Sequence, residues 1–213
     1  MKGKILLLLT LLFINYADSQ NLLANSGFET GGSGFGFVTN GAGYTPLAAP
    51  YSGTTVPGNF AIVNNPNLLN TTDFIFEGDH TTGTGRMLVI DGNTNATNPR
   101  FWRAGNTGGG ITTLTIGTTY RFSYWIKSVS NLGSPADIAI QITGGTAPTL
   151  LAGSTIAPPP SQSWRQVVYS FVATATTAQI ELWNTNTSAT GNDFAVDDFM
   201  LTANIIVSPN VTN

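Results

Sequence analysis

Short apolar or alternating runs, separated by Gly, Asn, Pro and Thr, dominate the hydrophobic pattern of this 213-residue chain. Alternation of apolar and polar residues is typical of half-buried β-strands, whereas an amphipathic helix repeats its apolar residues every three or four positions. No stretch keeps that helical spacing over three turns. The pattern predicts ten strands, at residues 21–29, 59–65, 86–92, 100–105, 112–116, 118–129, 136–144, 163–175, 178–185 and 193–202.

Ten short strands at this spacing predict an all-β fold, a two-sheet antiparallel β-sandwich of the jelly-roll type. The Gly- and Pro-rich segments 30–58 and 145–162 should be long loops. In the strand at 118–129 every second residue is apolar, and that stripe should face the core. Arg121 and Trp125 belong to the other stripe and should face outward.

Residues 1–19 have the pattern of a secretory signal peptide. A short basic start precedes the apolar run Ile5–Ile14, and the small residues Ala17 and Ser19 stand before the expected cleavage point. The apolar run is too short to span a membrane, which takes ~20 residues, and no second run of spanning length follows. We therefore expect a secreted protein, extracellular or at the cell surface, that does not insert into a membrane.

Residues 20–203 should form one domain, because ~180 residues are enough for one core. Residues 204–213 are either a tail or the start of a linker to a further domain of the same surface protein. Removing Lys2, Lys4 and Asp18 with the signal leaves 6 basic and 10 acidic residues, a net charge of −4. That balance argues against nucleic acid as a partner. The chain has no Cys, so its core, with or without a metal ion, must hold the fold.

Residue types that serve in catalysis are scarce. His80 is the only His, there is no Cys, and no G-x-S-x-G motif occurs. Glycoside hydrolysis needs two carboxylates that flank one bond, and no spacing among the acidic residues singles out such a pair. We therefore expect no enzymatic activity.

The chain does contain the residue types that commonly bind saccharides. Pyranose rings pack their C–H faces on aromatic planes, and their hydroxyls need polar partners. Three of the four Trp residues have polar neighbours on or beside their strands. The predicted ligand-binding residues are Trp102, Arg103, Arg121, Trp125 and Trp183. For each Trp, packing at an edge or in the core is the alternative.

Four segments occur along the chain in a recognisable order. They are "LLANSGFETG" (22–31), "GDHTTGTGRMLVIDG" (78–92), "TTYRFSYWIKS" (118–128) and "GNDFAVDDFMLT" (191–202). Together they resemble carbohydrate-binding-module-like jelly rolls of the galactose-binding-like superfamily, found in secreted bacterial surface proteins and glycanases. The resemblance covers about residues 21–203. It implies a non-catalytic module that recognises a polysaccharide or glycan through exposed aromatics. A structural or adhesive spacer domain without a sugar site is the alternative.

Two adjacent carboxylates, Asp197 and Asp198, stand in an otherwise apolar strand, where unpaired charges are costly to bury. The resemblance implies a structural calcium ion where the first and last strands lie side by side, with Glu29 and Asp197 as acidic ligands. The loop 78–83 should add carbonyl oxygens, and Asp79 a third carboxylate, in keeping with the oxygen ligands of calcium. Strand alternation should send Asp198 to the opposite side from Asp197. Alternatively, both carboxylates cap loops or face solvent.

Overall fold

The computed structural model describes residues 20–31, 43–94, 100–104, 111–146 and 152–204. The predicted signal peptide and all but the first residue of the tail lie outside these ranges. One short 3-10 helix, η1 (Pro66–Leu68), occurs among the described residues, and no helix there is long and apolar enough to cross a membrane.

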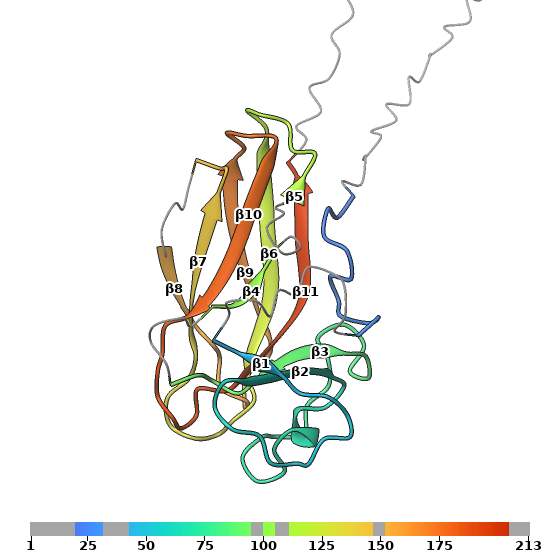
Figure 1. Cartoon of the computed structure of the whole chain (residues 1–213), viewed down its shortest axis with the longest axis vertical. Coiled ribbons are helices and arrows are strands. Elements are labelled where there is room, and N and C mark those ends of the chain that lie inside the picture. Colours follow the sequence, from blue (N-terminus) through green and yellow to red (C-terminus); the bar gives the residue numbers. More distant parts are fainter. Residues whose placement is uncertain (1–19, 32–42, 95–99, 105–110, 147–151, 205–213) are drawn as a thin grey trace, which may run out of the picture.

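Eleven strands form two sheets that pack face to face (Figure 1). Their bounds are β1 (Thr45–Pro46), β2 (Asn59–Val63), β3 (Met87–Ile90), β4 (Arg100–Arg103), β5 (Ile111–Thr112), β6 (Thr119–Ser128), β7 (Asp137–Thr143), β8 (Ala152–Ile156), β9 (Arg165–Val172), β10 (Thr177–Asn184) and β11 (Phe194–Ala203). The six-stranded sheet has the order β1-β2-β3-β11-β6-β9. The five-stranded sheet has the order β4-β10-β7-β8, with β5 paired to β10.

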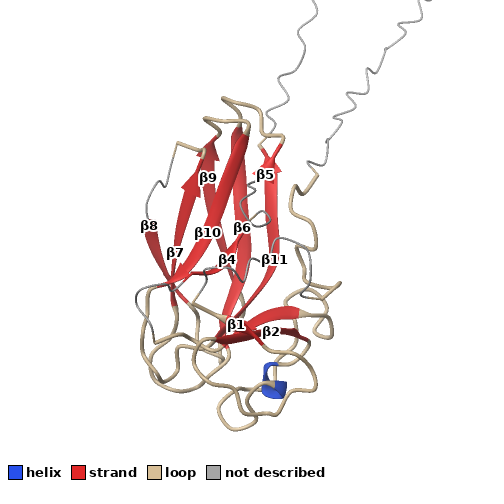
Figure 2. Cartoon of the chain, viewed as in Figure 1, coloured by secondary structure: helices blue, strands red, loops and turns tan. Residues whose placement is uncertain are grey.

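The predicted two-sheet β-sandwich is confirmed, and Figure 2 shows strands and loops with almost no helix. All strand pairs in the described residues are antiparallel except the two-residue pairing of β1 with β2. The sequence pattern did not predict β1 and β8, which lie in segments expected to be loops. Both are edge strands, and β1, with two exposed residues, is too short to show alternation.

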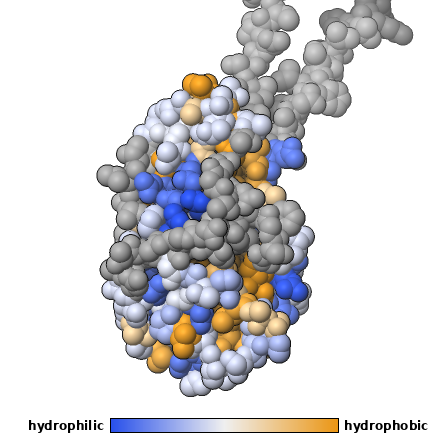
Figure 3. Space-filling view, in the orientation of Figure 1, coloured by the Kyte–Doolittle hydropathy of each residue, from blue (hydrophilic) through white to orange (hydrophobic). Residues whose placement is uncertain are grey.

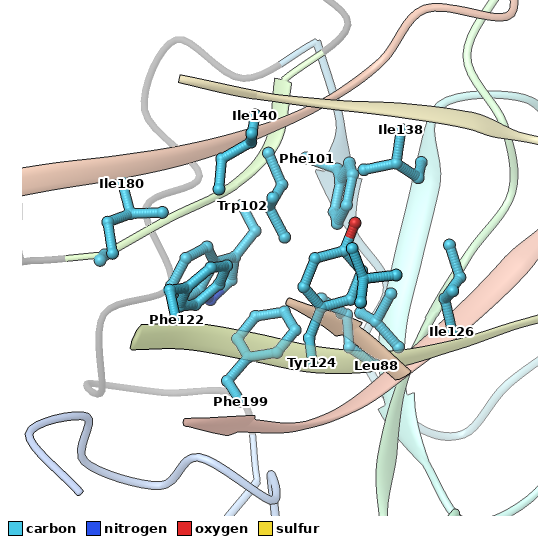
Figure 4. Close-up of a cluster of buried hydrophobic side chains, with 14 of the residues drawn as sticks. Leu88, Phe101, Trp102, Phe122, Tyr124, Ile126, Ile138, Ile140, Ile180 and Phe199 are labelled. Atoms are coloured by element: carbon cyan, nitrogen blue, oxygen red, sulfur yellow. The ribbon is translucent and has the colours of Figure 1, made fainter. Parts of the chain in front are cut away.

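Alternate side chains of the two sheets meet in one main core (Figure 4). On β6 the inward residues are the predicted apolar stripe, Tyr120, Phe122, Tyr124 and Ile126. Ile138 and Ile140 of β7 are fully buried in the same core. Close-packed aromatic and aliphatic side chains of this kind supply most of the free energy of folding, at ~1.5–3 kcal/mol for each large side chain.

The six-stranded sheet also carries a smaller hydrophobic cluster on its outer face. Val63 of β2 and Met87 and Val89 of β3 are buried there under Leu69 and Phe74 from the connecting loops. Strands β2 and β3 are therefore buried on both faces. This explains why their sequences are continuous apolar runs rather than alternating ones.

Residues 21–29 do not form a strand, so that prediction is wrong. The segment nevertheless lies along β11, as expected: the Leu22 N–H donates to the Leu201 carbonyl at 2.9 Å. The Asn21 side chain accepts a second hydrogen bond, from the Leu201 N–H, also at 2.9 Å. Phe28, which is fully buried, has a φ of 61°, a left-handed conformation that no extended strand contains.

A pair of buried carboxylates lies where β3 ends and β11 begins. Asp91 follows Ile90 and Asp193 precedes Phe194, and these two strands pair at that point. The Gly92 N–H donates to Asp193 Oδ1 at 3.0 Å. Burial, and then the nearby charge of Asp193, raises the pKa of Asp91 to about 7, and burial raises the pKa of Asp193 as well. The pair therefore retains a proton close to neutral pH.

We expect the domain to lose stability as the pH rises from about 5 to 8. In the unfolded chain these carboxyls ionise near pH ~4, whereas the folded pair keeps a proton until about pH 7, so raising the pH removes a proton that favours the folded state. The melting temperature should fall by roughly 5–10 °C over this range, and Asp91→Asn should remove about half of that fall. Asp197, whose pKa is also raised, contributes in the same direction.

Thermal denaturation at several pH values measures this dependence. The control is Asp137→Asn, which changes a partly exposed carboxylate on the five-stranded sheet and should leave most of the wild-type slope. An Asp91→Asn variant with the full wild-type slope would show that the pair does not hold the proton.

Candidate functional site

The outer face of the five-stranded sheet carries a cluster of polar side chains, which we call the arginine–tryptophan face. Its members are Arg100, Arg103, Gln141, Glu181 and Trp183. Alternation along β10 sends its apolar residues into the core and leaves Glu181 and Trp183 outside. Because β10 lies between β4 and β7, Glu181 has Arg103 on one side and Gln141 on the other. Figure 3 shows a strongly hydrophilic area over the middle of this sheet.

A single-residue β-bulge brings both arginines to this face. Leu182 pairs with Trp102 and Trp183 pairs with Arg100, so β4 has one residue more than β10 at this point. The additional residue is Phe101, which is buried in the main core. If β4 alternated regularly, without the bulge, Arg100 would point inward like Trp102. Arg100 was not among the predicted ligand-binding residues, since a bulge depends on the partner strand and leaves no local signal in the sequence.

Glu181 neutralises one of the two guanidinium groups. Arg100 Nη1 donates to Glu181 Oε1 at 2.7 Å, while Arg103 Nη1 lies 3.9 Å from the same oxygen. The three side chains are only 11–14 % exposed. The guanidinium of Arg100 also lies over the ring of Trp183, 5.6 Å from its centroid, a cation–π contact. The face is therefore a closely spaced, largely desolvated set of charges around one aromatic ring.

Arg103 Nε and Trp183 Nε1 are buried donors on this face that have no hydrogen-bond partner among the described residues. An unpaired buried N–H costs ~1–3 kcal/mol, so oxygen atoms of a ligand placed here would relieve a penalty that the domain carries alone.

Trp102 was predicted as a surface platform, and that prediction is wrong. Its side chain is 5 % exposed and belongs to the main core. It stacks on Phe122 with ring centroids 5.7 Å apart and an interplanar angle of 16° (Figure 4). The ring of Phe199 meets it edge-on at 4.4 Å. The bulge at Phe101 hides the true alternation of β4 in the sequence, which is why Trp102 could not be assigned to a face.

Arg121 and Trp125 lie on β6, on the outer face of the other sheet, so the predicted ligand-binding residues do not form one site. Trp125 is half-buried, and the His80 ring stacks on it at 3.8 Å with an interplanar angle of 16°. A cavity of about 300 Å³ adjoins Trp125 and is lined in part by Ser123 and Gln166. Trp125 is thus a platform with one face already covered.

The predicted metal ligands Glu29, Asp79 and Asp197 lie around one loop, residues 78–86. A Cβ on Gly85 would lie 2.4 Å from Glu29 Oε1 and 3.0 Å from Asp79 Oδ2, so only Gly permits these carboxylates to approach the loop so closely. Among the described residues, however, no three His, Cys, Asp or Glu side chains form a group that could hold a metal ion.

Asp79 serves mainly to organise this loop. Its two oxygens accept hydrogen bonds from the backbone N–H groups of Thr81, Thr82 and Gly85 and from the Thr82 hydroxyl, at 2.6–3.2 Å. Burial opposes ionisation of Asp79, but these hydrogen bonds outweigh it and lower the pKa of the carboxyl. Four donors leave Asp79 little capacity for an ion.

Asp198 does not point away from Asp197, contrary to the prediction. Between Asp197 and Met200, β11 has one residue more than β6, and Asp198 takes a left-handed φ of 49°. Both carboxylates therefore reach the same loop. The His80 N–H donates to Asp197 Oδ2 at 2.9 Å, and His80 Nδ1 lies 2.7 Å from Asp198 Oδ2. Burial, and then the charge of Asp198, raises the pKa of Asp197 to about 7.

Comparison with known protein families found no match, and comparison with curated proteins found none either. Several solved structures are similar to this chain. A family 16 carbohydrate-binding module is 16 % identical with a TM-score of 0.46, over 85 % of this chain and 99 % of that one. TmCBM61, solved in complex with β-1,4-galactotriose, is 14 % identical with a TM-score of 0.43, over 87 % and 99 % of the two chains.

A third similar structure is the CBM22-1 xylan-binding domain from Paenibacillus barcinonensis Xyn10C. It is 13 % identical with a TM-score of 0.42, over 70 % of this chain and 84 % of that one. These structures are carbohydrate-binding modules, the group that the sequence motifs resemble. Likeness at this level carries no conclusion about the ligand, which has to be argued from the side chains of this chain.

Two Trp→Ala substitutions should separate the core from the site. Trp102→Ala removes a stacked ring from the main core and should destabilise the domain by ~3–5 kcal/mol, whereas Trp183→Ala, on the outer face, should cost less than about half as much. Urea denaturation of the two variants measures the difference. Equal losses of stability would mean that Trp183 is a packing residue and not part of a surface site.

Proposed function

We propose that this chain is a non-catalytic module that binds a polysaccharide or glycan on its arginine–tryptophan face. The observation that supports this is the pair of unpartnered donors, Arg103 Nε and Trp183 Nε1, beside the carboxylate of Glu181. Saccharide hydroxyls both donate and accept hydrogen bonds, so they suit a face that offers donors and an acceptor together. The face of the Trp183 ring that Arg100 does not cover adds an apolar plane for a pyranose.

The cluster is suited to binding rather than hydrolysis. Glycosidases use two carboxyl groups about 5–10 Å apart on either side of the bond that they cleave. Of the residues that form the arginine–tryptophan face, Glu181 alone is acidic, and its Oε1 is held by Arg100. Export directed by residues 1–19 would bring the module to extracellular polysaccharides.

A structural or adhesive spacer domain is the second candidate. Ile156 and Val168 are 53 % and 41 % exposed, on the edge strands β8 and β9 respectively. Exposed apolar residues on unpaired strand edges suit contact with a neighbouring domain. This function would need no ligand on the arginine–tryptophan face.

We also propose that a calcium ion stabilises the loop at 78–86. Glu29, Asp79, Asp197 and Asp198 place four carboxylates around this loop. Glu29 and Asp197 fit the ion best, because Asp79 is occupied by donors from its own loop. Asp197 accepts one N–H bond on each oxygen, from His80 and from Asp198, and because each carboxylate oxygen offers two acceptor sites, both oxygens keep a site for a cation. Bound calcium would supply positive charge and hold the loop against β11.

Affinity electrophoresis of the mature chain against a panel of soluble polysaccharides tests the binding function. Retardation by at least one of them is expected, and Trp183→Ala should weaken it by ~10-fold or more, because the ring plane and its N–H are both lost. Trp125→Ala is the matched control, since it removes a Trp from the opposite sheet and should leave retardation unchanged.

Two results would count against this assignment. Loss of retardation in Trp125→Ala alone would place the site beside His80. No retardation across the panel would favour the spacer function.

Chelation tests the calcium proposal. Adding EDTA should lower the melting temperature by roughly 5 °C or more, and calcium should restore it better than magnesium, because an ion that binds only the folded state stabilises that state. Asp197→Asn should abolish the response, while Asp73→Asn, a change at an exposed carboxylate outside the loop, should keep it. A wild-type melting temperature that EDTA does not change would refute the proposal.

A further inference from the structure

The arginine–tryptophan face contains more positive than negative charge. Arg100 is paired with Glu181 at 2.7 Å, and the same oxygen is 3.9 Å from Arg103, so one carboxylate serves two guanidinium groups. The next acidic residue on this side of the sheet is Asp137, four residues before Gln141 on β7, which is roughly 13 Å along the strand. The guanidinium charge of Arg103 is therefore left without a full counter-charge from the residues of this face.

The two unpartnered donors lie close enough to serve one sugar residue. Arg103 is paired with Glu181, and Trp183 is the next outward residue along β10. Outward residues two apart on a strand are separated by ~7 Å, about the span of a pyranose ring with its exocyclic group. An anionic group at the arginine and a ring face at the tryptophan would thus fit a single residue of the ligand.

The chemistry of the guanidinium selects the kind of group. The Nε–H and one Nη–H of an arginine form a planar fork that matches two oxygens of a carboxylate or sulfate, and such charge-assisted pairs are stronger than bonds to a neutral hydroxyl. Among the described residues the Nε of Arg103 has no partner, and its Nη1 is too far from Glu181 for a hydrogen bond. A neutral sugar would satisfy the N–H groups but leave the charge uncompensated.

We propose that the ligand of this face is an acidic saccharide, with an oxyanion held by Arg103 and a ring packed on Trp183. This inference rests on the proposed saccharide-binding function and specifies the class of sugar. The mature chain is acidic overall, with 6 basic and 10 acidic residues and a net charge of −4. Attraction to polyanions in general is therefore not expected, and recognition has to come from this local cluster.

The test compares saccharides that differ only in charge. Affinity electrophoresis should show ~10-fold tighter binding of the mature chain to polygalacturonate, or to another uronate polymer, than to the same polymer with its carboxylates methyl-esterified. Sulfated galactans form a further arm, since sulfate offers the same oxyanion to the fork. Polyglutamate, an acidic polymer without sugar, is the control for general attraction and should not bind.

Substitutions test whether Arg103 is responsible for the preference for acidic polymers. Arg103→Gln should abolish the preference for the acidic polymer, and Arg103→Lys, which keeps the charge but not the fork, should retain only part of it. Arg121→Gln changes an exposed arginine on the opposite sheet and should leave the preference intact. Melting temperatures of the variants confirm that each is folded.

The outcomes separate this inference from the proposed function. Equal binding of charged and esterified polymers would overturn the acidic-saccharide inference while leaving saccharide binding in place. Binding of sulfated but not uronate polymers would support an oxyanion ligand and identify sulfate as its source. Binding of no saccharide at all would overturn both. A preference that survives Arg103→Gln would also overturn the inference, because another part of the chain would then recognise the anion.

Discussion

Alternation of side chains along a strand is the constraint on which both surface clusters depend. In each cluster one inserted residue breaks it, Phe101 in β4 and Asp198 in β11. Each insertion leaves an aromatic ring in the core and turns a charged residue onto the surface. At the first bulge the charged residue is Arg100, and at the second it is Asp198. Bulges of this kind often redirect side chains at functional sites.

The aromatic core fixes where the second bulge lies. Phe199, the residue that follows it, meets the rings of Trp102, Phe28 and Tyr124 with centroids 4.4, 5.3 and 5.7 Å apart. Moving the insertion by one position would expose this ring or bury a carboxylate in its place. Because a buried aromatic ring and an exposed charge are both strongly preferred, the register of β11 has little freedom. The packing of the core therefore also fixes the position of the loop that contacts Asp197 and Asp198.

The local sequence pattern was sufficient to predict the two-sheet sandwich, but it predicted only part of the candidate site. The apolar stripe of β6 and the outward position of Trp183 follow from period-two alternation. Trp102 and Arg100 could not be assigned, because a bulge is defined by pairing with a strand 80 residues away. Trp125 and Trp183 lie on different sheets because of the strand order, and the strand order cannot be predicted from the alternation of side chains. Glu29 was placed near the loop at 78–86 through the resemblance of motifs, not through its own neighbours in sequence.

The hydrogen bonds between the N-terminal segment and β11 determine how the domain responds to a pulling force. Leu22 is bonded to Leu201 and Ser26 to Phe199, so the two segments run in opposite directions and the ends of the described chain lie close together (Figure 1). Tension applied between residues 20 and 204 would load these bonds one after another, as in a zipper, instead of all at once in shear. The segment would then peel away at low force before the strand pairs of the two sheets began to separate.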